Sequence, residues 1–600
     1  MACLSACRLA ISPVSVTPSS FAPVYISPSL ASERILPETT IAIRYQPKVI
    51  PARVAPALFT VSGDHSGLHA GVTTVSDDHM TILFKPTLPF SLAESVTVHF
   101  DGGPLGVDAR VLLSADTKFS IIAARPAAPT AATVSTDQST PTAATPAVHM
   151  QSPYATVTES VPFISITHYL PTLDTESIFL MPSSSSVTNT AYLLILDGAG
   201  ELQYYRALPT GHVYGNFMPQ GNGHLTYFEG TLTSAGGGAG LYREMDSAYR
   251  LVRTYEAGNG YKADAHELLV LPDGHALLTI YDTEISDMSE YGGRPDARFI
   301  DSLIQELDTS GNVILQWRAS DHVPMTQTYE ALNGALVDPY HGNSIDVLPD
   351  GNLLLSFRHL SQMIKVDRHS GAVIWRMGGK NSDFNFTNDS GFSYQHHATW
   401  LANGHLSVFD NGNQHAPPTS RAVEYEVDQT NMLVTRTWQF ARTPSIFGAF
   451  MGNVLMLPDG GHFIGWGGPV PAASLVSHDG LLQLDLQVMT PGDQVYRWYK
   501  APFTSTPDTS PVLVIQSTDA ISTTMRFSWN GATEVGTYRI DASQDGIHWA
   551  PVQLQPRQGF ETSTVISRTA GQTCFYRVVA ISKVSMQELK SSNSVHVKCA

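Results

Sequence analysis

Three histidines, His266, His341 and His396, each lie a few residues ahead of a Gly-containing turn of the LPDG or LANG type. Asn343 lies in the second of these segments, and Arg358 follows its turn. One histidine at such a position is more often a hydrogen-bonded core residue than a catalytic one, but three at the same phase favour a shared site. Imidazoles grouped with a guanidinium and an amide suit a metal ion or a tetrahedral oxyanion.

Between these two ligands, the arginine favours the anion. Three neutral imidazoles with an open fourth position are a known catalytic zinc arrangement, so a metal-dependent hydrolase is kept as an alternative. A fixed guanidinium beside a dication is electrostatically costly, whereas His, Arg and Asn side chains together can hold an oxyanion. The sequence therefore predicts a site without metal or cofactor, made of His266, His341, His396, Asn343 and Arg358.

The stretch GFSYQHHATWLANGHLSVFDNG, residues 391–412, is the densest part of the predicted site. The alternation from Phe392 through Tyr394 to His396 has the period of a β-strand, so His396 and His397 are expected to point to opposite faces. The LANG sequence then reverses the chain into a second strand, which ends at FDNG. We therefore expect only His396 to face the site, from the first strand of a hairpin.

An internal repeat between residues 151 and 505 determines the predicted fold. One repeated element is the LPDG-type hairpin, and the other is a strand, an Asp-centred turn and a strand with an aromatic residue. Two hairpins per copy make four strands, which is one propeller blade, and the first strand of each blade lines a central channel. Six copies therefore predict a six-bladed β-propeller. The turn aspartates are Asp197, Asp246, Asp308, Asp367, Asp428 and Asp485, and the aromatic residues expected to pack between blades are Tyr205, Tyr255, Trp317, Trp375, Trp438 and Trp498.

The rest of the chain predicts two flanking β-sandwiches, so the whole protein is expected to be all-β. Residues 21–125 have short strand-like runs between Pro and Gly turns and resemble bacterial Ig-like domains. Residues 126–150 are rich in Ala, Thr and Pro and read as a linker. Residues 510–600 resemble a fibronectin type III domain, with Trp529 in its second strand and YRVVA in a late one.

Composition limits the partners. Aromatic residues at 9% and charged residues at 15% favour β structure, and a net charge of −18 disfavours nucleic acid as a partner. No apolar run is long enough to span a membrane, and the N-terminus matches a signal peptide poorly. The four cysteines lie near the two ends and form no CxxC pattern; Cys574 and Cys599 are either one disulfide or two buried thiols. The oligomeric state stays open.

Five motifs in order resemble the aryl sulfotransferases that do not use a nucleotide sulfate donor. They are DxH before the LPDG turn, HxNS, SFR, GxVxWRxGG, and QHxA leading into FDNG. The resemblance covers roughly residues 160–505 and is strongest from 338 to 412. It implies an exported six-bladed propeller enzyme, extracellular or periplasmic, with a phenolic sulfate ester and a phenol as its small-molecule partners. Such enzymes move a sulfuryl group from the ester to the phenol by a ping-pong path through a sulfohistidine.

Carried over by position, the resemblance assigns roles to the predicted site. His396 would be the nucleophile, His266 and His341 would contact sulfate oxygens or transfer protons, Asn343 would orient, and Arg358 would neutralise charge. Because free imidazole has a pKa of about 6.5, the nucleophile is mostly neutral at pH 7 without a dedicated base. A non-catalytic adhesion protein, in which the flanking modules carry the function, is the other alternative. The aromatic residues expected near the phenyl ring are Tyr261, Tyr340, Phe392 and Tyr394.

Overall fold

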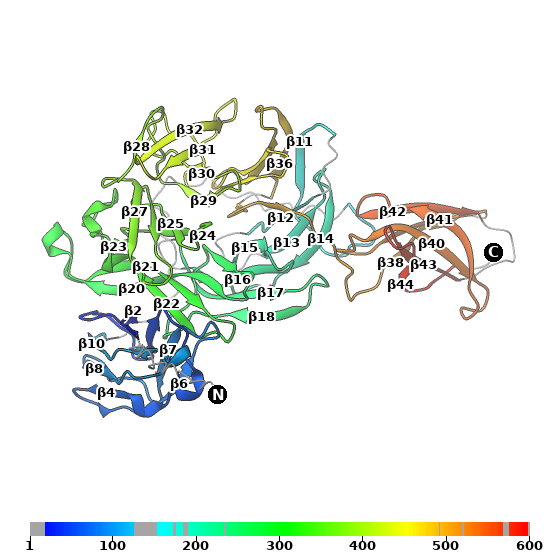
Figure 1. Ribbon diagram of the computed structural model, residues 1–600. Helices are drawn as coiled ribbons and strands as arrows, with labels where there is room; N and C mark the ends of the chain where they lie inside the picture. Colours follow the sequence, from blue (N-terminus) through cyan, green and yellow to red (C-terminus); the bar gives the residue numbers. More distant parts are fainter. Residues whose placement is uncertain are drawn as a thin grey trace, which may run out of the picture. The chain divides into compact units, whose positions relative to one another are not determined.

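The computed structural model is built from β-strands joined by turns and a few short 3-10 helices (Figure 1), which confirms the all-β prediction. The chain divides into two compact units, of which the first consists mainly of the residues up to Ala124. The predicted linker, 126–150, and all four cysteines lie outside the described residues. The structure describes residues 19–124, 153–171, 176–183, 190–232, 236–490, 492–518, 521–567 and 575–597.

The first unit contains two four-stranded antiparallel sheets with apolar side chains between them, including Ile43, Phe84, Val98 and Phe100. Alternation along its strands places every second side chain in this core. One sheet has the order β10 (Ala115–Ser120), β8 (Ser95–Phe100), β4 (Phe59–Gly63), β5 (Gly67–Leu68), and the other β2 (Pro23–Ser27), β3 (Ile41–Tyr45), β7 (Thr81–Pro86), β6 (Gly71–Val75). β1 (Ser20–Phe21) pairs with β9 (Val111–Leu112), and the 3-10 helices are Pro51–Arg53, Pro56–Leu58 and Val107–Ala109.

Residues 164–501 of the second unit form six sheets, which we call the six-sheet domain. The first two sheets are β12 (Ser177–Leu180), β13 (Tyr192–Leu196), β14 (Leu202–Ala207) and then β15 (Val213–Pro219), β16 (Leu225–Leu232), β17 (Gly238–Met245), β18 (Leu251–Tyr255). The third and fourth are β19 (Leu268–Val270), β20 (Ala276–Ser286), β21 (Ala297–Leu307), β22 (Val313–Arg318) and β24 (Gly342–Val347), β25 (Leu353–Phe357), β26 (Gln362–Val366), β27 (Val373–Gly378). The last two are β29 (His396–Trp400), β30 (Leu406–Asp410), β31 (Arg421–Asp428), β32 (Leu433–Phe440) and β33 (Asn453–Met456), β34 (His462–Gly465), β35 (Ala472–Val476), β36 (Leu482–Val488).

Strands from both ends of this domain complete its first and last sheets. β37 (Tyr499–Ala501) pairs with β12, and β11 (Ile164–Tyr169) pairs with β36. Short strands β23 (Leu336–Val337) and β28 (Asn385–Phe386) add to β21 and β32, and 3-10 helices lie at Ser289–Tyr291, Ala319–Asp321 and Met325–Gln327. First strands of neighbouring sheets contact one another, for example β24 with both β19 and β29. Six sheets with such first-strand contacts and an end-to-end closure are what a six-bladed propeller requires.

Five of the six predicted turn aspartates lie in turns of the structure, and they are Asp197, Asp246, Asp308, Asp367 and Asp428. The Oδ1 atom of each accepts a backbone N–H two residues ahead, which is the hydrogen bond of an Asx turn. The prediction for Asp485 is wrong, because it lies inside β36 and its carboxylate accepts bonds from Ser474 and Thr167. Ser477 makes the sixth turn, where its hydroxyl accepts the Leu481 N–H.

Three of the predicted aromatic residues link neighbouring sheets through their indole N–H groups. Trp317 donates to the Gly371 carbonyl at 3.0 Å, Trp375 to Gln429 Oε1 at 3.1 Å, and Trp438 to the His478 carbonyl at 2.9 Å. Trp498 instead lies just before the closing strand β37, and its backbone N–H and C=O both bond the Asn453 side chain of β33. The repeat predicts that Trp498 packs between blades, but the strand that directly follows it, β37, already belongs to the first sheet.

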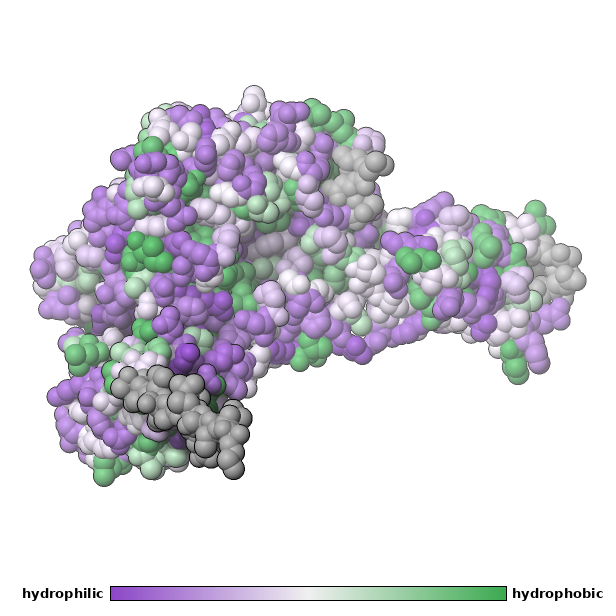
Figure 2. All heavy atoms as spheres, viewed as in Figure 1, coloured by the Kyte–Doolittle hydropathy of each residue, from purple (hydrophilic) through white to green (hydrophobic). Residues whose placement is uncertain are grey.

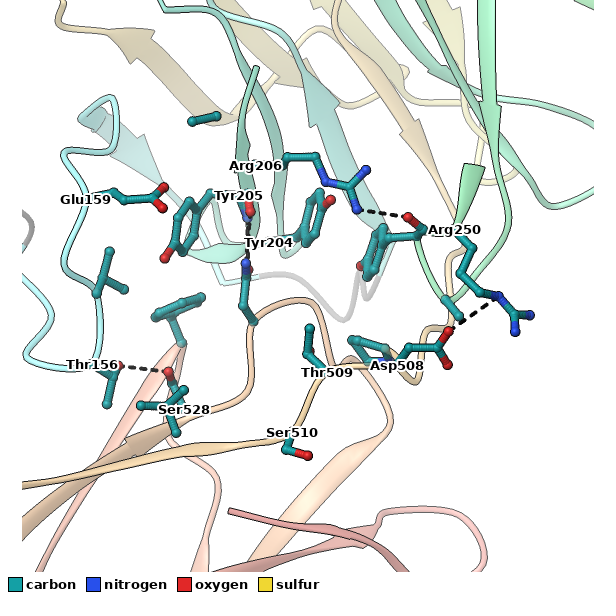
Figure 3. A pocket seen from close by; sticks show the side chains of 18 residues that line it. Thr156, Glu159, Tyr204, Tyr205, Arg206, Arg250, Asp508, Thr509, Ser510 and Ser528 are labelled. Carbon is teal, nitrogen blue, oxygen red and sulfur yellow. Dashed lines mark hydrogen bonds and ion pairs between the residues drawn. The ribbon is translucent and has the colours of Figure 1, made fainter. Parts of the chain in front are cut away.

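The C-terminal residues form a second sandwich with Trp529 buried in its core, directly after a strand. Its sheets are β38 (Val512–Thr518), β39 (Ser522–Ser528), β42 (Glu561–Ser567) and β41 (Ala550–Pro556), β40 (Val535–Ser543), β43 (Phe575–Ser582), β44 (Glu588–Ser591), with β45 (Val595–His596) on β43. The Asn530 side chain bonds both the N–H and the C=O of Tyr205, so it takes the place of a strand partner on the edge strand β14. Beside this contact lies a cavity of about 480 Å³, lined by residues that include Tyr205, Arg250 and Asp508 (Figure 3).

Hydrophilic residues cover much of the face seen in Figure 2, in keeping with the net charge of −18. Among the described residues no helix has the length and hydropathy that a membrane crossing would need.

Candidate active site

The structure brings the three predicted histidines together at the beginnings of first strands. His266 precedes β19, His341 precedes β24, and His396 is the first residue of β29. The ring centroids of His266 and His341 are 5.1 Å apart, and the Tyr496 ring lies 5.5 Å from His266 and 6.5 Å from His396. Exposed fractions of 5%, 8% and 2% for His266, His341 and His396 show that all three imidazoles are buried.

Carboxylates orient two of these imidazoles. His266 Nδ1 bonds Asp264 Oδ2 at 2.6 Å, and His341 Nδ1 bonds Asp338 Oδ2 at 2.6 Å. Because an ionised carboxylate only accepts hydrogen bonds, the proton of each neutral ring lies on Nδ1 and the lone pair on Nε2. Both rings can therefore receive or deliver a second proton at Nε2.

His396 has an amide as its partner instead. Asn411 donates its Nδ2–H groups to the carbonyls of Gly448 and Met451 at 2.6 and 3.0 Å, so its Oδ1 is the atom that faces His396 Nδ1 at 2.8 Å. His396 Nδ1 must then donate, which leaves the lone pair on Nε2. That lone pair accepts the backbone N–H of Met451 at 3.1 Å. His396 Nε2, the nitrogen that would attack a substrate, is thus unprotonated and accepts one hydrogen bond, from the Met451 N–H.

Electrostatics keep His396 neutral. Burial lowers the pKa of His396 well below its ordinary value, the Arg358 charge lowers it further, and the bond to Asn411 opposes both. Burial also lowers the pKa of His341 well below the ordinary range. A neutral imidazole at position 396 is what a nitrogen nucleophile needs near pH 7.

The two carboxylates differ in their own titration. Burial raises the pKa of Asp264, but the His266 charge and hydrogen bonds from His266 and Gly238 lower it more, so this carboxyl stays ionised. Burial raises the pKa of Asp338 above its ordinary value. Asp264 thus presents a full negative charge to the Nδ1–H group of His266.

Arg358 follows β25 and supplies the positive charge of the site. Its Nη2 donates to the Ala449 carbonyl at 2.9 Å, and its guanidinium lies 4.7 Å from the centre of the Tyr394 ring. The Arg358 Nε atom is buried and has no hydrogen-bond partner among the described residues. Burial lowers the pKa of Arg358, yet a guanidinium remains protonated under all ordinary conditions. A free N–H donor in a buried site is available to an anion.

Asn343 acts on the backbone rather than on the neighbouring imidazoles. Its Nδ2 donates to the Gln395 carbonyl at 2.8 Å, directly ahead of His396, and its Oδ1 is buried without a partner. Asn216 and Asn453 make the equivalent bonds, to the carbonyls of His266 and Trp498 at 3.0 and 2.7 Å. Each of these asparagines follows a glycine within or at the start of a first strand, but Gly-Asn pairs also occur in turns of this chain, so the pair alone does not predict the role.

The prediction of a regular strand from Phe392 to Ala398 is wrong. β29 begins at His396, the register shifts between His396 and Ala398, and Tyr394 and His397 have left-handed φ angles of 54° and 47°. The cause is the buried Gln395 amide, which bonds three groups of the preceding sheet and pulls the chain out of strand geometry. His397 is buried, and burial lowers its pKa well below the ordinary value.

Sequence reasoning missed three rings at the site. Tyr281 stacks on His266 at 5.1 Å, Tyr496 lies between His266 and His396, and His359 packs 4.4 Å from His341. His359 directly follows Arg358 in the SFRH sequence, and that adjacency was its available signal. Of the predicted aromatic residues, Tyr394 borders the site, whereas Tyr340 bonds the Val323 carbonyl, Tyr261 bonds Arg318, and Phe392 packs in the core.

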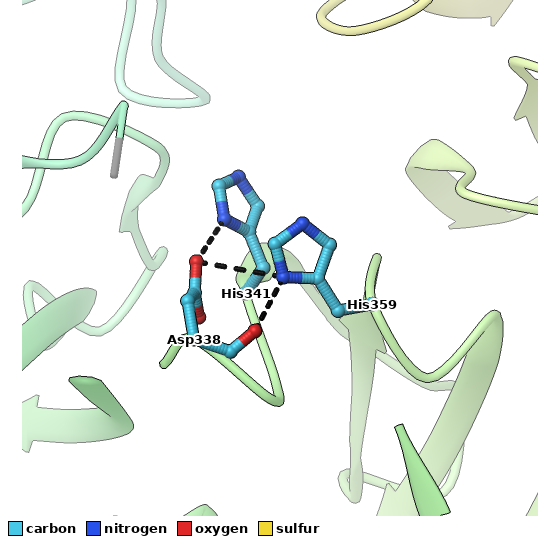
Figure 4. A group of neighbouring side chains, drawn as sticks. All are labelled: Asp338, His341 and His359. Atoms are coloured by element: carbon cyan, nitrogen blue, oxygen red, sulfur yellow. Dashed lines mark hydrogen bonds and ion pairs between the residues drawn. The ribbon is translucent and has the colours of Figure 1, made fainter. Parts of the chain in front are cut away.

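In the part of the chain that the structure describes, Asp338, His341 and His359 have the spacing of metal ligands, with ligand atoms within 4.8 Å of one another. His266 and His396, the other members of the predicted three-histidine zinc alternative, are not in this group. Figure 4 shows Nδ1 of both imidazoles turned toward Asp338, where His341 bonds Oδ2 and His359 bonds the backbone carbonyl at 2.6 Å. Protons on these nitrogens account for the contacts without a cation.

Comparison with known proteins supports one family. Residues 218–487 match the family model described as Arylsulfotransferase (ASST). A segment of 94 residues is 37% identical to arylsulfate sulfotransferase AssT of Lelliottia amnigena, covering 14% of this chain and 15% of that protein's length.

Two solved structures show weaker likeness. A Bacteroides caccae protein of unknown function is 13% identical with a TM-score of 0.36, covering 55% of this chain and 99% of that one. Virginiamycin B lyase of Staphylococcus aureus is 9% identical with a TM-score of 0.31, covering 62% and 97%. The match to the family model, which includes all five predicted site residues, places residues 218–487 of this chain in the arylsulfotransferase (ASST) family.

Proposed function

We propose that this protein transfers a sulfuryl group from a phenolic sulfate ester to another phenol, through a covalent intermediate on His396 Nε2. The observation that carries the proposal is the contrast in hydrogen-bond partners. His396 is neutral and its Nδ1–H bonds an amide oxygen, whereas the Nδ1–H groups of the neighbouring His266 and His341 bond carboxylates. The Arg358 charge acts on His396 in the same site. This arrangement provides a nucleophile, a cation and proton-transfer groups in one buried cluster.

In the first half-reaction, the His396 Nε2 lone pair attacks the sulfur of the ester. An N–S bond forms, the S–O bond to the aryl ring breaks, and the phenolate leaves with the electron pair. Arg358 neutralises the charge that gathers on the sulfuryl oxygens, where preorganised donors commonly contribute about 3 to 4 kcal/mol each. An imidazolium at His266, stabilised by the ionised Asp264, protonates the departing phenolate oxygen.

In the second half-reaction, His266 Nε2 takes the proton of the acceptor phenol. The phenolate oxygen attacks sulfur, the S–O bond forms, and the N–S bond breaks. His396 Nδ1 keeps its proton throughout, hydrogen-bonded to Asn411 Oδ1, so the departing group is a neutral imidazole. The enzyme and its proton count are then restored.

The Met451 N–H has two successive partners in this scheme. Without substrate it donates to His396 Nε2 at 3.1 Å, so attack requires this bond to be released. Once the sulfuryl group is on Nε2, the same N–H lies next to the sulfuryl oxygens and can donate to one of them. Met451 has a left-handed φ of 62°, which fixes the direction of its N–H.

The family resemblance supports phenolic sulfates and phenols as substrates and a location outside the cytoplasm. Neither a nucleotide nor a metal enters the scheme. Steady-state kinetics with 4-nitrophenyl sulfate and phenol test it. We expect 4-nitrophenol release to depend on phenol, with parallel double-reciprocal plots at different phenol concentrations and no loss of rate in EDTA.

Two outcomes would favour the alternatives. Release of inorganic sulfate without phenol, abolished by EDTA, would support a metal-dependent hydrolase built on the Asp338, His341 and His359 group. No release of 4-nitrophenol under any condition would support a non-catalytic protein whose flanking sandwiches carry the function.

A further inference from the structure

Exposure increases stepwise from the buried histidines to one carboxylate. His266, His341 and His396 are buried, Arg358 and Tyr394 are half-buried, and Glu330 is exposed. Arg358 contacts the Tyr394 ring and the Tyr394 hydroxyl bonds Glu330, so these three residues form a row of contacts that ends at the surface. A substrate with its sulfur at His396 and its ring along this row would have its non-reacting end near Tyr394 and Glu330.

Hydrogen bonds fix Glu330 at this position. The Tyr394 hydroxyl donates to Glu330 Oε1 at 2.7 Å, and the Glu330 N–H donates to Thr328 Oγ1 at 3.1 Å. The Thr328 hydroxyl and the Tyr329 N–H both donate to the carbonyl of His359, at 3.3 and 2.9 Å. Glu330 is thus held through both its backbone N–H and its side chain by residues that border the site.

The charge of Glu330 reaches the site. Among the charges that oppose the effect of burial on the pKa of Arg358, that of Glu330 is the largest. The neighbouring cation, Lys380, donates to the carbonyls of Thr326 and Thr328 and lies 5.1 Å from the Tyr329 ring. Lys380 is therefore directed at the backbone of the loop, and Glu330 is the negative charge next to Tyr394.

We propose that Glu330 makes the site selective for phenolic amines, in which a cationic group lies at the end of the ring away from the phenol oxygen. A carboxylate at the entrance attracts an ammonium group and repels a carboxylate on the same ring position. The inference rests on the proposed sulfuryl transfer and adds the class of acceptor. In this proposal Arg358 interacts with the sulfuryl oxygens at one end of the substrate, and Glu330 interacts with the ammonium group at the other end.

Three acceptors of similar size test the proposal, with 4-nitrophenyl sulfate as donor. They are tyramine, which is cationic, 4-ethylphenol, which is neutral, and 3-(4-hydroxyphenyl)propanoate, which is anionic. In the wild type we expect kcat/KM to fall in that order. In Glu330→Gln the tyramine-to-propanoate ratio should fall about tenfold, because one unit charge a few ångströms from the substituent is removed. The glutamine Oε1 can still accept the Tyr394 hydroxyl, so the variant changes charge and not shape.

Two controls separate this effect from net charge and from the loop. Asp479→Asn removes one carboxylate on an exposed turn between β35 and β36 and should leave the ratio unchanged. Tyr394→Phe removes the hydrogen bond but keeps the carboxylate, so the order of acceptors should persist. Raising the salt concentration should reduce the wild-type ratio toward that of Glu330→Gln, since exposed charges are screened.

A wild type with no preference among the three acceptors, or a Glu330→Gln variant with an unchanged ratio, would overturn the selectivity while leaving sulfuryl transfer in place. Absence of transfer to all three acceptors would overturn the proposed function, and the selectivity with it.

Discussion

The Nδ1–H group of His396 donates to the Asn411 amide oxygen at 2.8 Å, whereas the equivalent nitrogens of His266 and His341 face carboxylates at 2.6 Å. A carboxylate partner stabilises an imidazolium, and an amide partner does so much less. This contrast supports the proposal that His396 is the nucleophile and that His266 transfers protons. It also makes sulfohistidine a good donor, because nothing removes the Nδ1 proton.

Replacing Asn411 by Asp should impair the nucleophile. A carboxylate beside Nδ1 raises the pKa of His396, so less of the neutral ring is present at pH 7 and the acid limb of the kcat/KM profile moves to higher pH. We expect at least a tenfold loss of kcat/KM at pH 6, partly recovered at pH 9. A pH profile measured from 5 to 10 for both proteins checks this. An acid limb at the wild-type position would contradict the assigned role of the amide.

Replacing Asp264 by Asn should affect poor leaving groups most. Without the carboxylate, His266 holds its proton less well, and phenolate needs that proton whereas 4-nitrophenolate is stable without it. We expect kcat with phenyl sulfate to fall about 100-fold and kcat with 4-nitrophenyl sulfate to fall far less. Asp338→Asn serves as the comparison, because Asp338 bonds His341, which transfers no proton in the proposed scheme. Equal losses with both donors would mean that Asp264 only maintains structure.

His359 should make stability depend on pH. Burial lowers the pKa of His359 to about 3, whereas an unfolded histidine titrates near 6.5. Between these values the unfolded chain binds a proton that the folded chain does not, so the free energy of unfolding falls as pH falls below 6.5. His359→Asn should reduce that slope by about 1.4 kcal/mol per pH unit between pH 6 and 5. Urea unfolding at several pH values measures the slope, and an equal slope in both proteins would refute a buried neutral His359.

Gly531 should be essential for the contact between the C-terminal sandwich and the six-sheet domain. It has a φ of 85°, and a Cβ atom there would lie 2.5 Å from Tyr249 Cε2 and 2.8 Å from Tyr204 Cδ2. Gly531→Ala therefore adds a steric clash to about 1 to 2 kcal/mol of backbone strain. Gly559→Ala is the matched control, since Gly559 also has a positive φ but no atom within 4 Å of its added Cβ.

We expect Gly531→Ala to lower Tm several degrees more than Gly559→Ala and to expose residues 505–512 to protease. Indistinguishable Tm values and cleavage patterns would show that the two domains do not meet at this glycine.

The positions of the three histidines could be predicted from the sequence because the turn motifs fix where each first strand begins. The LPDG-type turns placed His266 and His341 at one phase, and the rings meet at 5.1 Å. The same reasoning failed at Asp485, because the turn begins at Ser477, whose hydroxyl accepts the N–H four residues ahead, as Asp197 Oδ1 also does. A repeat defined by one residue type misses a substitution that keeps the hydrogen bond.

The other residues of the site had no repeated signal. Tyr496 comes from the segment that returns to the first sheet, and nothing in the repeat indicates that this segment runs past His266 and His396. Asn411 lies in the FDNG motif, but its bond to His396 depends on the hairpin register and on carbonyls of 448 and 451. Glu330 lies in a loop between β22 and β23, a region in which sequence patterns carry no period.

Intact-protein mass after brief mixing with 4-nitrophenyl sulfate, without acceptor, tests the central claim most directly. The covalent mechanism predicts one sulfuryl adduct on the wild type, none on His396→Ala, and loss of the adduct when phenol is added. Peptide mapping should place it on His396 and not on His397, whose side chain has different neighbours. Release of 4-nitrophenol by the wild type with no adduct, or an adduct retained in His396→Ala, would contradict the sulfohistidine at this position.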